Sequence, residues 1–254
     1  MSVHYRFDIY GVTDTGRVRR HNEDCIGWDF GRNVVVLADG MGGHNAGDVA
    51  SSLAVEGLLR EYLVPSSDLL TDVKTLIGQL IERINAEIYQ RAQDNPDHAR
   101  MGTTLVMTCL VDGDIIIAHA GDSRVYRWHP GEIEQMTEDH SLVTQLIGQG
   151  ALSREEAENS HYKHVITRAL GVKPVCAADI MQYPARDGDV YLLCSDGLSN
   201  KIPDLQMKQT LEKSKGNWGV AVQTLVDLAN QAGGEDNISV VLAAVTPVQE
   251  GQDD

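Results

Sequence analysis

The hydrophobic pattern of the chain alternates between short apolar runs and long amphipathic stretches. Residues 33–39, NVVVLAD, are so uniformly apolar that they predict a strand buried on both faces, and residues 5–13 predict another strand. Residues 46–63 and 67–93 instead repeat apolar side chains at helical spacing, and Ser67 is a suitable N-cap for the second stretch. The chain is therefore predicted to begin with strands followed by two long helices.

The middle and the end of the chain predict hairpin-linked strands and a second pair of helices. Asp112-Gly113 separates TTLVMTCLV from DIIIAHAG, which is a strong β-hairpin signal, and further strands are expected at SRVYRWH, GEIEQMT, DVYLLCSD and NISVVLAAV. Helices are expected over 203–213 and 217–232. Because strands and helices are segregated along the chain, the pattern favours an α+β sandwich over a parallel doubly wound sheet. Residues 137–170 fit neither period, as is typical of a lid or binding loop.

Composition and charge narrow the functional class. The 254 residues are 42% hydrophobic and 23% charged, which is typical of a globular protein, and the formal net charge of −16 disfavours nucleic acid or an anionic membrane as a partner. The four cysteines are far apart, which favours a reducing compartment. No apolar run approaches the roughly 18 residues of a membrane span. We therefore expect a cytoplasmic enzyme.

Four Asp-Gly pairs occur in the chain, and two of them differ from ordinary turns. Asp112-Gly113 and Asp187-Gly188 lead directly into predicted strands and are interpreted as turns. Asp39-Gly40 and Asp196-Gly197 instead follow buried apolar strands and precede a loop and a helix. Together with Asp236 in GGEDNISVV, they can bring hard oxygen ligands from distant segments to neighbouring strand ends, which is the ligand chemistry of magnesium and manganese.

An arginine cluster near the N-terminus points to phosphate. TDTGRVRRHNED, residues 13–24, places Arg17, Arg19 and Arg20 shortly before Glu23 and Asp24. Guanidinium groups beside carboxylates suggest recognition of a phosphate next to a metal ion, and the alternative is a solvated loop with local ion pairs.

An ordered series of motifs resembles a known family. TDTGRVRRHNED, ADGMGGHNAGDVAS, MGTTLV, AHAGDSRVY, VITRALG, LLCSDGLSN and EDNISVVL, in this order from about residue 9 to 246, are similar to the motifs of the protein phosphatase 2C family, the PPM metal-dependent serine/threonine phosphatases, in their compact bacterial form. The resemblance implies a four-layer αββα sandwich, two antiparallel sheets flanked by pairs of helices. It implies one phosphatase domain over residues 1–248, with a flap at about 137–170 and a disordered tail at 249–254.

The same resemblance implies roles for individual residues. Asp39 matches the carboxylate that bridges two Mn²⁺ or Mg²⁺ ions, Gly40 supplies a carbonyl ligand, Asp196 and Asp236 complete the first metal site, and Asp122 with Asp196 matches a third, weaker site. Glu23 and Asp24 match the acidic pair that supports the cluster, and Arg19 aligns with the phosphate-binding arginine, with Arg17 and Arg20 as alternatives.

One departure leaves the proton donor open. Animal members carry a histidine directly after the metal-binding Asp-Gly, whereas this chain has Met41 there and His44 three residues later. A metal-bound water, His44 or a flap histidine (His140, His161 or His164) could protonate the leaving oxygen, although flap surface positions are the plainer interpretation of the last three.

The expected activity is hydrolysis of phosphoserine and phosphothreonine in proteins. The resemblance implies direct attack by a metal-bridging water, without a phospho-enzyme, in a monomer that opposes a serine/threonine kinase. Two rival hypotheses are a pseudo-phosphatase that binds phosphoproteins without turnover and a structural calcium-binding domain. Asp39, Asp196 and Asp236 argue against the first, and the arginine cluster argues against the second.

Overall fold

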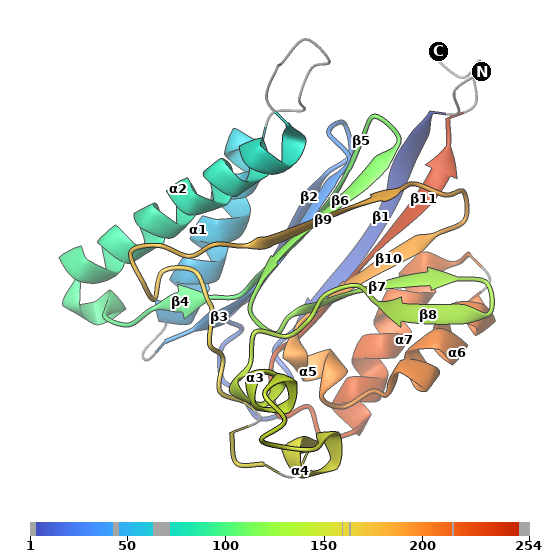
Figure 1. The fold of residues 1–254 in the computed structure, drawn as a ribbon. Helices are drawn as coiled ribbons and strands as arrows, with labels where there is room; N and C mark the ends of the chain where they lie inside the picture. The colour runs from blue at the N-terminus through green and yellow to red at the C-terminus, as the bar shows by residue number, and fades with distance from the viewer. Residues whose placement is uncertain are drawn as a thin grey trace.

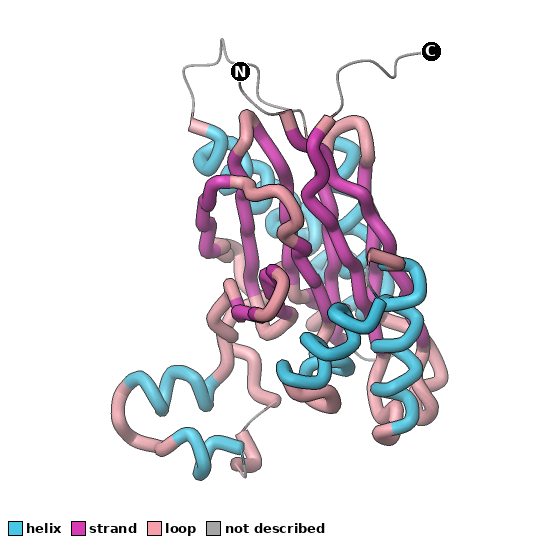
Figure 2. Tube along the Cα trace, turned by 90° about the vertical axis from the view of Figure 1, so that its right-hand side faces the viewer, coloured by secondary structure: helices cyan, strands magenta, loops and turns pink. Residues whose placement is uncertain are grey.

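Two antiparallel β-sheets stacked face to face form the centre of the molecule, and helices cover their outer surfaces (Figure 1). The computed structural model describes residues 4–42, 46–62, 72–158, 160–162, 164–214 and 216–248. A view turned by 90° shows helices on both sides of the paired sheets (Figure 2). The α+β class and the four-layer arrangement predicted from the sequence are confirmed.

The first sheet joins the two ends of the described chain. Its strands, in spatial order, are β1 (Tyr5–Asp14), β11 (Ile238–Pro247), β10 (Val190–Cys194), β7 (Arg124–His129) and β8 (Glu132–Gln135). β1 pairs with β11 along its whole length, from Tyr5 opposite Pro247 to Asp14 opposite Ile238. The arginine-rich segment after Asp14 and the acidic segment before Ile238 therefore meet at one end of this sheet.

The second sheet contains the expected hairpin. Its strands, in spatial order, are β2 (Asp24–Asp29), β3 (Val34–Met41), β5 (Leu105–Val111), β6 (Asp114–Ala120) and β9 (Asp179–Pro184), and β4 (Gly102–Thr103) pairs with the end of β3. The turn between β5 and β6 has φ of 51° at Asp112 and 85° at Gly113. Positive φ at both central residues characterises the type I′ turn that Asp-Gly favours.

Three apolar layers hold the sheets and helices together. Side chains at alternate positions of β3 show the division, because Val35 and Leu37 lie in the layer between the two sheets, whereas Val34 and Val36 pack beneath helices. In β11, Val241 likewise faces the inter-sheet layer. Both faces of these strands are covered, which explains why their sequences are apolar without alternation.

Two pairs of helices form the outer layers, and shorter helices lie near one end of the sandwich. α1 (Ala46–Glu61) and α2 (Val73–Asp94) cover the second sheet, and α6 (Asp204–Ser214) and α7 (Trp218–Gln231) cover the first. The remaining helices are η1 (Pro96–His98), α3 (Leu142–Gly148), α4 (Arg154–Glu158) and α5 (Asp196–Ser199). α3 and α4 fall inside the irregular segment 137–170, where a flap is expected, and project from the sandwich in Figure 1.

The long predicted elements agree with the structure, but the short elements β4, η1 and α5 were not predicted. β2 and β9 were not predicted from the sequence, because β2 mixes Asp, Cys and Gly with apolar residues and β9 is an edge strand with several exposed positions. The helix predicted over 67–93 is present from Val73 to Asp94. Its expected N-cap, Ser67, and the tail at 249–254 lie outside the described residues.

Candidate active site

Carboxylates from both sheets gather at one end of the inter-sheet layer. Asp39 follows Val35 and Leu37 at alternate positions of β3, so its side chain continues the face that points between the sheets. Asp24 on β2 lies directly opposite Asp39 in the antiparallel register. Ser195, at the end of β10, donates its hydroxyl to Asp24 Oδ2 at 2.8 Å and accepts the Ser239 backbone N–H at 2.9 Å. This hydroxyl therefore ties the two sheets together beneath the carboxylates.

The other two acidic motifs come from the first sheet. Asp196 begins α5 directly after β10, and Asp236 precedes β11, which is hydrogen-bonded to β10. A Cβ added at Gly197 would lie 2.0 Å from the backbone oxygen of Asn237, so only glycine allows the two segments to approach this closely. Along the chain, α6 and α7 separate Asp196 from Asp236. The pairing of β10 with β11 places both residues at the same end of the first sheet.

Asn237 joins this end of the first sheet to the arginine-rich segment. Its Nδ2 donates to the backbone oxygens of Thr15 at 2.9 Å and His21 at 3.0 Å, and its Oδ1 accepts the Glu23 N–H at 2.8 Å. Arg19 lies on the segment held in this way and donates to Asp236 Oδ2 at 2.8 Å. Its side chain is 49% exposed, which leaves the guanidinium accessible to a ligand.

Glu23 and Gly40 are locked against the start of α1. The Gly40 N–H donates to the Glu23 backbone oxygen at 3.0 Å, and the Ser51 hydroxyl donates to the same oxygen at 2.6 Å. A Cβ at Gly40 would lie 2.1 Å from the Gly47 oxygen, and one at Gly47 would lie 2.8 Å from the Glu23 carboxyl carbon. Glycine at both positions lets the acidic segment approach the N-terminus of a helix, where a negative charge is favoured.

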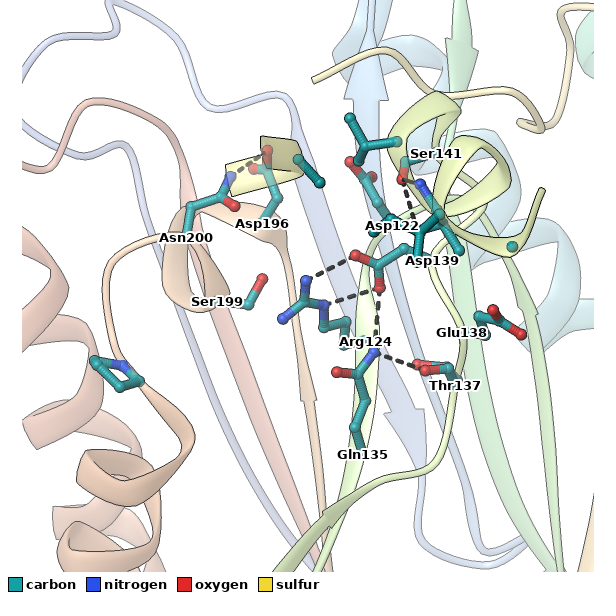
Figure 3. Close-up of a pocket in the computed structure, with 16 residues that line it drawn as sticks. Asp122, Arg124, Gln135, Thr137, Glu138, Asp139, Ser141, Asp196, Ser199 and Asn200 are labelled. Carbon is teal, nitrogen blue, oxygen red and sulfur yellow. Dashed lines mark hydrogen bonds and ion pairs between the residues drawn. The ribbon is translucent and has the colours of Figure 1, made fainter. Parts of the chain in front are cut away.

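Asp122 belongs to the turn between β6 and β7, at the edge of a large cavity. The cavity has a volume of about 940 Å³ and lies between the first part of the flap and α5 (Figure 3). Asp122 and Asp196 both line it. Arg124 also lines it, but its guanidinium donates to both carboxylate oxygens of Asp139, at 2.9 and 2.7 Å. That bidentate pair neutralises Asp139, so Asp122, Asp196 and exposed Glu138 are the remaining acidic residues of the cavity lining.

Crowding raises the pKa values of the clustered carboxyls. Burial first, and then the charges of Asp24, Asp196, Asp122 and Asp236, hold the pKa of Asp39 well above its usual range. Burial raises the pKa of Asp24 to about 7 despite the serine hydroxyls of Ser239 and Ser195 beside it, and burial together with the charge of Asp196 raises the pKa of Asp122 to about 7. Burial and Asp236 also raise the pKa of Asp196. The site thus concentrates negative charge that water solvates poorly.

The donor set fits divalent cations. Asp24 Oδ1 and Asp122 Oδ1 are buried and have no hydrogen-bond partner within the described part of the chain. Orphaned carboxylate oxygens beside further carboxylates and a backbone carbonyl are the hard ligands that magnesium and manganese prefer. All three arginines are exposed, and Arg19 is the one hydrogen-bonded to this cluster, through Asp236. His44 lies outside the described residues.

A second polar cluster was missed in the sequence. His119, His140 and Asp179 present potential ligand atoms within 4.8 Å of one another. His140 is not a flap surface residue, because its side chain is only 10% exposed, whereas His161 and His164 are exposed. The position of His119, three residues before Asp122 on a strand that otherwise reads as apolar, is the only signal that could have found the cluster.

Comparison with known proteins agrees with this geometry. The family model described as protein phosphatase 2C matches residues 16–236. The serine/threonine phosphatase stp of Listeria innocua is 41% identical over 246 residues, which cover 95% of this chain and 97% of that protein.

Two solved structures show the same fold. The Mycobacterium tuberculosis serine/threonine phosphatase PstP/Ppp superimposes with a TM-score of 0.86 at 34% identity, covering 95% of this chain and 99% of that chain. A PstP catalytic domain in complex with two manganese ions gives a TM-score of 0.83 at 33% identity, covering 96% of this chain and 100% of that chain. No helix in the described ranges is both long and apolar enough to cross a bilayer. The chain therefore belongs to the protein phosphatase 2C family and is a metal-dependent serine/threonine protein phosphatase.

Proposed function

We propose that this phosphatase hydrolyses phosphoserine and phosphothreonine in proteins and reverses the action of a serine/threonine kinase. The observation that carries the proposal is the convergence of Asp39, Asp24, Asp196 and Asp236 at one end of the sandwich, with the Arg19 guanidinium bonded into the cluster. The substrates are the phosphorylated proteins of that kinase, or the kinase itself.

Each acidic residue takes a specific part in holding Mn²⁺ or Mg²⁺. Asp39 would contribute a ligand to both ion sites, the Gly40 carbonyl would complete the second site, and Asp196 and Asp236 would complete the first. Glu23 and Asp24 support the pair from beneath, where Ser195 and the Gly40 N–H fix their positions. Asp122 and Asp196, which both line the cavity, would hold a third ion. The orphaned oxygens of Asp24 and Asp122 support this assignment.

Two divalent cations, when bound, supply positive charge for the phosphoryl oxygens and a hydroxide nucleophile derived from water at neutral pH. Arg19 binds the non-bridging oxygens of the phosphate and exchanges its bond with Asp236 for the ligand. Its partial exposure permits this exchange, because an exposed ion pair is held by less than about 1 kcal/mol. Arg17 and Arg20, on the same segment, are the alternative phosphate-binding residues. The leaving oxygen would take its proton from His44, from a metal-bound water or from one of the flap histidines.

The protein acts as a monomeric cytoplasmic enzyme, without nucleic acid or membrane partners. The net charge of −16 supports the absence of polyanionic partners. All four cysteines are free, as in a reducing compartment. Residues 1–248 form a single phosphatase domain whose flap spans about residues 137–170.

The test compares two aspartates that occupy the same Asp-Gly sequence context. Asp39→Asn removes the bridging carboxylate, whereas Asp112→Asn changes a hairpin turn in which asparagine is equally favourable. Purified protein is expected to release phosphate from a phosphothreonine peptide with Mn²⁺, and chelation of the metal is expected to stop this release. Asp39→Asn is expected to lower kcat/KM by at least about 10³-fold, and Asp112→Asn is expected to leave kcat/KM unchanged. Metal binding without turnover would favour the pseudo-phosphatase, and binding of Ca²⁺ alone would favour the structural domain.

A further inference from the structure

The cluster of His119, His140 and Asp179 joins the flap to the sandwich. His119 of β6 lies opposite Asp179 of β9 in the antiparallel register, and the His119 and His140 rings are stacked with their centroids 4.5 Å apart and an angle of 13° between their planes. His140 stands at the start of the flap, and its Nε2 lies 3.1 Å from Asp179 Oδ2.

The hydrogen bonds of His140 specify its tautomer. The backbone N–H of Gly121 donates to His140 Nδ1 at 3.1 Å, so Nδ1 carries a lone pair. A neutral imidazole then bears its proton on Nε2, which donates that proton to Asp179. In the opposite direction, the His140 backbone N–H donates to the Gly121 oxygen at 2.9 Å. Gly121 is therefore held through both its N–H and its C=O, and Asp122 is the next residue.

A cation bound by the same three side chains would not fit this geometry. A metal at His140 Nε2 displaces its proton and moves it to Nδ1, which would then face the Gly121 N–H donor. In addition, imidazole binds metals through an in-plane lone pair, and two nearly parallel stacked rings cannot direct such lone pairs at one point. The cluster is therefore interpreted as a hydrogen-bonded clamp.

Both ends of the flap meet at Asp179. The Arg168 guanidinium, on the returning segment, donates to Asp179 Oδ1 and to the Ala177 backbone oxygen. The two segments are also bonded to each other, since the Thr167 N–H donates to the His140 oxygen at 2.7 Å. Asp179 of β9 thus orients the His140 ring through its hydrogen bond to Nε2. The ring in turn fixes, through Nδ1, the backbone of the turn that carries Asp122.

We propose that His140 is a positioning residue for the cation site formed by Asp122 and Asp196, acting by accepting the Gly121 N–H through Nδ1 in the tautomer that Asp179 selects. The inference rests on the proposed assignment of Asp122 and Asp196 to a third ion. It adds a physical link between that ion and the flap, because the residue that holds the turn is also the first anchor of the flap.

Two substitutions separate the two bonds of the imidazole. His140→Asn places an amide oxygen near the position of Nδ1 and keeps the acceptor for Gly121, whereas His140→Gln places its amide nitrogen near Nε2 and keeps only the donor to Asp179. Gln145→Ala is the matched control, because it removes a bond within the flap, from Gln145 Nε2 to Thr167 Oγ1 at 3.0 Å, that does not touch Gly121. Thermal unfolding checks that each variant folds.

The readouts are amide exchange of Gly121 by NMR and Mn²⁺ affinity by calorimetry, neither of which requires turnover. Loss of one hydrogen bond is expected to accelerate Gly121 exchange and to weaken the third Mn²⁺ step by about tenfold in His140→Gln. His140→Asn and Gln145→Ala are expected to stay within about threefold of the wild type. Long-range ¹⁵N spectra are expected to show His140 as the Nε2–H tautomer.

The inference would be overturned by equal effects of His140→Asn and His140→Gln, by an Nδ1–H tautomer in the wild type, or by a weak Mn²⁺ step that Asp122→Asn leaves unchanged. Loss of one bound ion upon Asp179→Ala, with Gly121 exchange unchanged, would also overturn it in favour of a cation at the histidines. Wild-type protein that binds Mn²⁺ but releases no phosphate would contradict the proposed function alone, because exchange and affinity would still report on His140.

Discussion

Replacing Asp122 with asparagine is expected to stabilise the metal-free protein at alkaline pH. The carboxyl is half-enclosed, its Oδ1 is buried without a hydrogen-bond partner in the described part of the chain, and Asp196 lies nearby. Burial and that neighbouring charge raise the pKa of Asp122 from 3.8 to about 7. Asparagine resembles the protonated, uncharged acid in size and shape, so it removes the charge that folding disfavours.

The sign and size of the effect follow from proton linkage. Because the folded-state pKa lies above the unfolded value, stability due to this group is fully present below pH 3.8 and is lost as the pH rises to about 7. The two pKa values differ by about three units, and each unit corresponds to about 1.4 kcal/mol. The free energy of unfolding therefore falls by up to about 4 kcal/mol over this pH interval. Asp122→Asn is therefore expected to match the wild type near pH 4 and to exceed its free energy of unfolding by up to about 4 kcal/mol at pH 8.

Urea unfolding in chelator, at half-unit steps from pH 4 to pH 8, measures the difference. Comparing variant with wild type cancels groups that both share, including buried His119, whose pKa is lowered to about 4 by burial and gives a slope of opposite sign. Asp187→Asn, at an exposed turn position, is the control for the substitution itself. A constant difference across this range, or a less stable Asp122→Asn at pH 8, would refute the electrostatic reasoning.

Three further substitutions test other parts of the site. Arg19→Ala is expected to lower kcat/KM for a phosphopeptide about 10²-fold or more, with the urea midpoint unchanged because its ion pair is exposed; an unchanged kcat/KM would assign phosphate binding elsewhere. Gly197→Ala is expected to destabilise the protein by about 1–3 kcal/mol, because the new Cβ would contact the Asn237 backbone oxygen, whereas the Cβ of Gly148→Ala would meet open space and should not destabilise it. Equal urea midpoints for the two variants would contradict the close approach at Gly197. Ser195→Ala is expected to lower the free energy of unfolding by about 3 kcal/mol, because it removes a bond to a buried carboxylate and orphans a backbone N–H of β11; a change below about 1 kcal/mol would contradict this.

Local patterns predicted most of the secondary structure, and the failures have local causes. Residues 34–39 and the Asp112-Gly113 hairpin were predictable because apolar runs and type I′ turns are decided by neighbouring residues. β9 was not, since an edge strand need bury only part of its surface and its sequence carries little hydrophobic signal. Strand order was also inaccessible, because pairing of β1 with β11 joins residues more than 200 positions apart.

The acidic residues of the site were predictable, but most of their supports were not. Asp39, Asp196 and Asp236 stand beside apolar strands in recognisable motifs, whereas Ser195 and Asn237 act through bonds to the backbone of distant segments. Such bonds leave no periodicity in the sequence. His140 shows the same limit, because both of its partners, Gly121 and Asp179, are fixed by the tertiary fold.

Close backbone contacts explain how the fold keeps like charges together. Carboxylates that repel one another would separate if their segments could move, but the space for a side chain at Gly40, Gly197 and Gly16 is filled by backbone oxygens 2.0–2.1 Å from each missing Cβ. The segments that carry Asp39, Asp196 and Asp236 are therefore packed too tightly to relax. Burial and this repulsion together raise the carboxyl pKa values in the folded state, and divalent cations bound among the carboxylates would relieve the repulsion. Such ions would thus also stabilise the fold, and their affinity is expected to increase with pH as the carboxyls lose their protons.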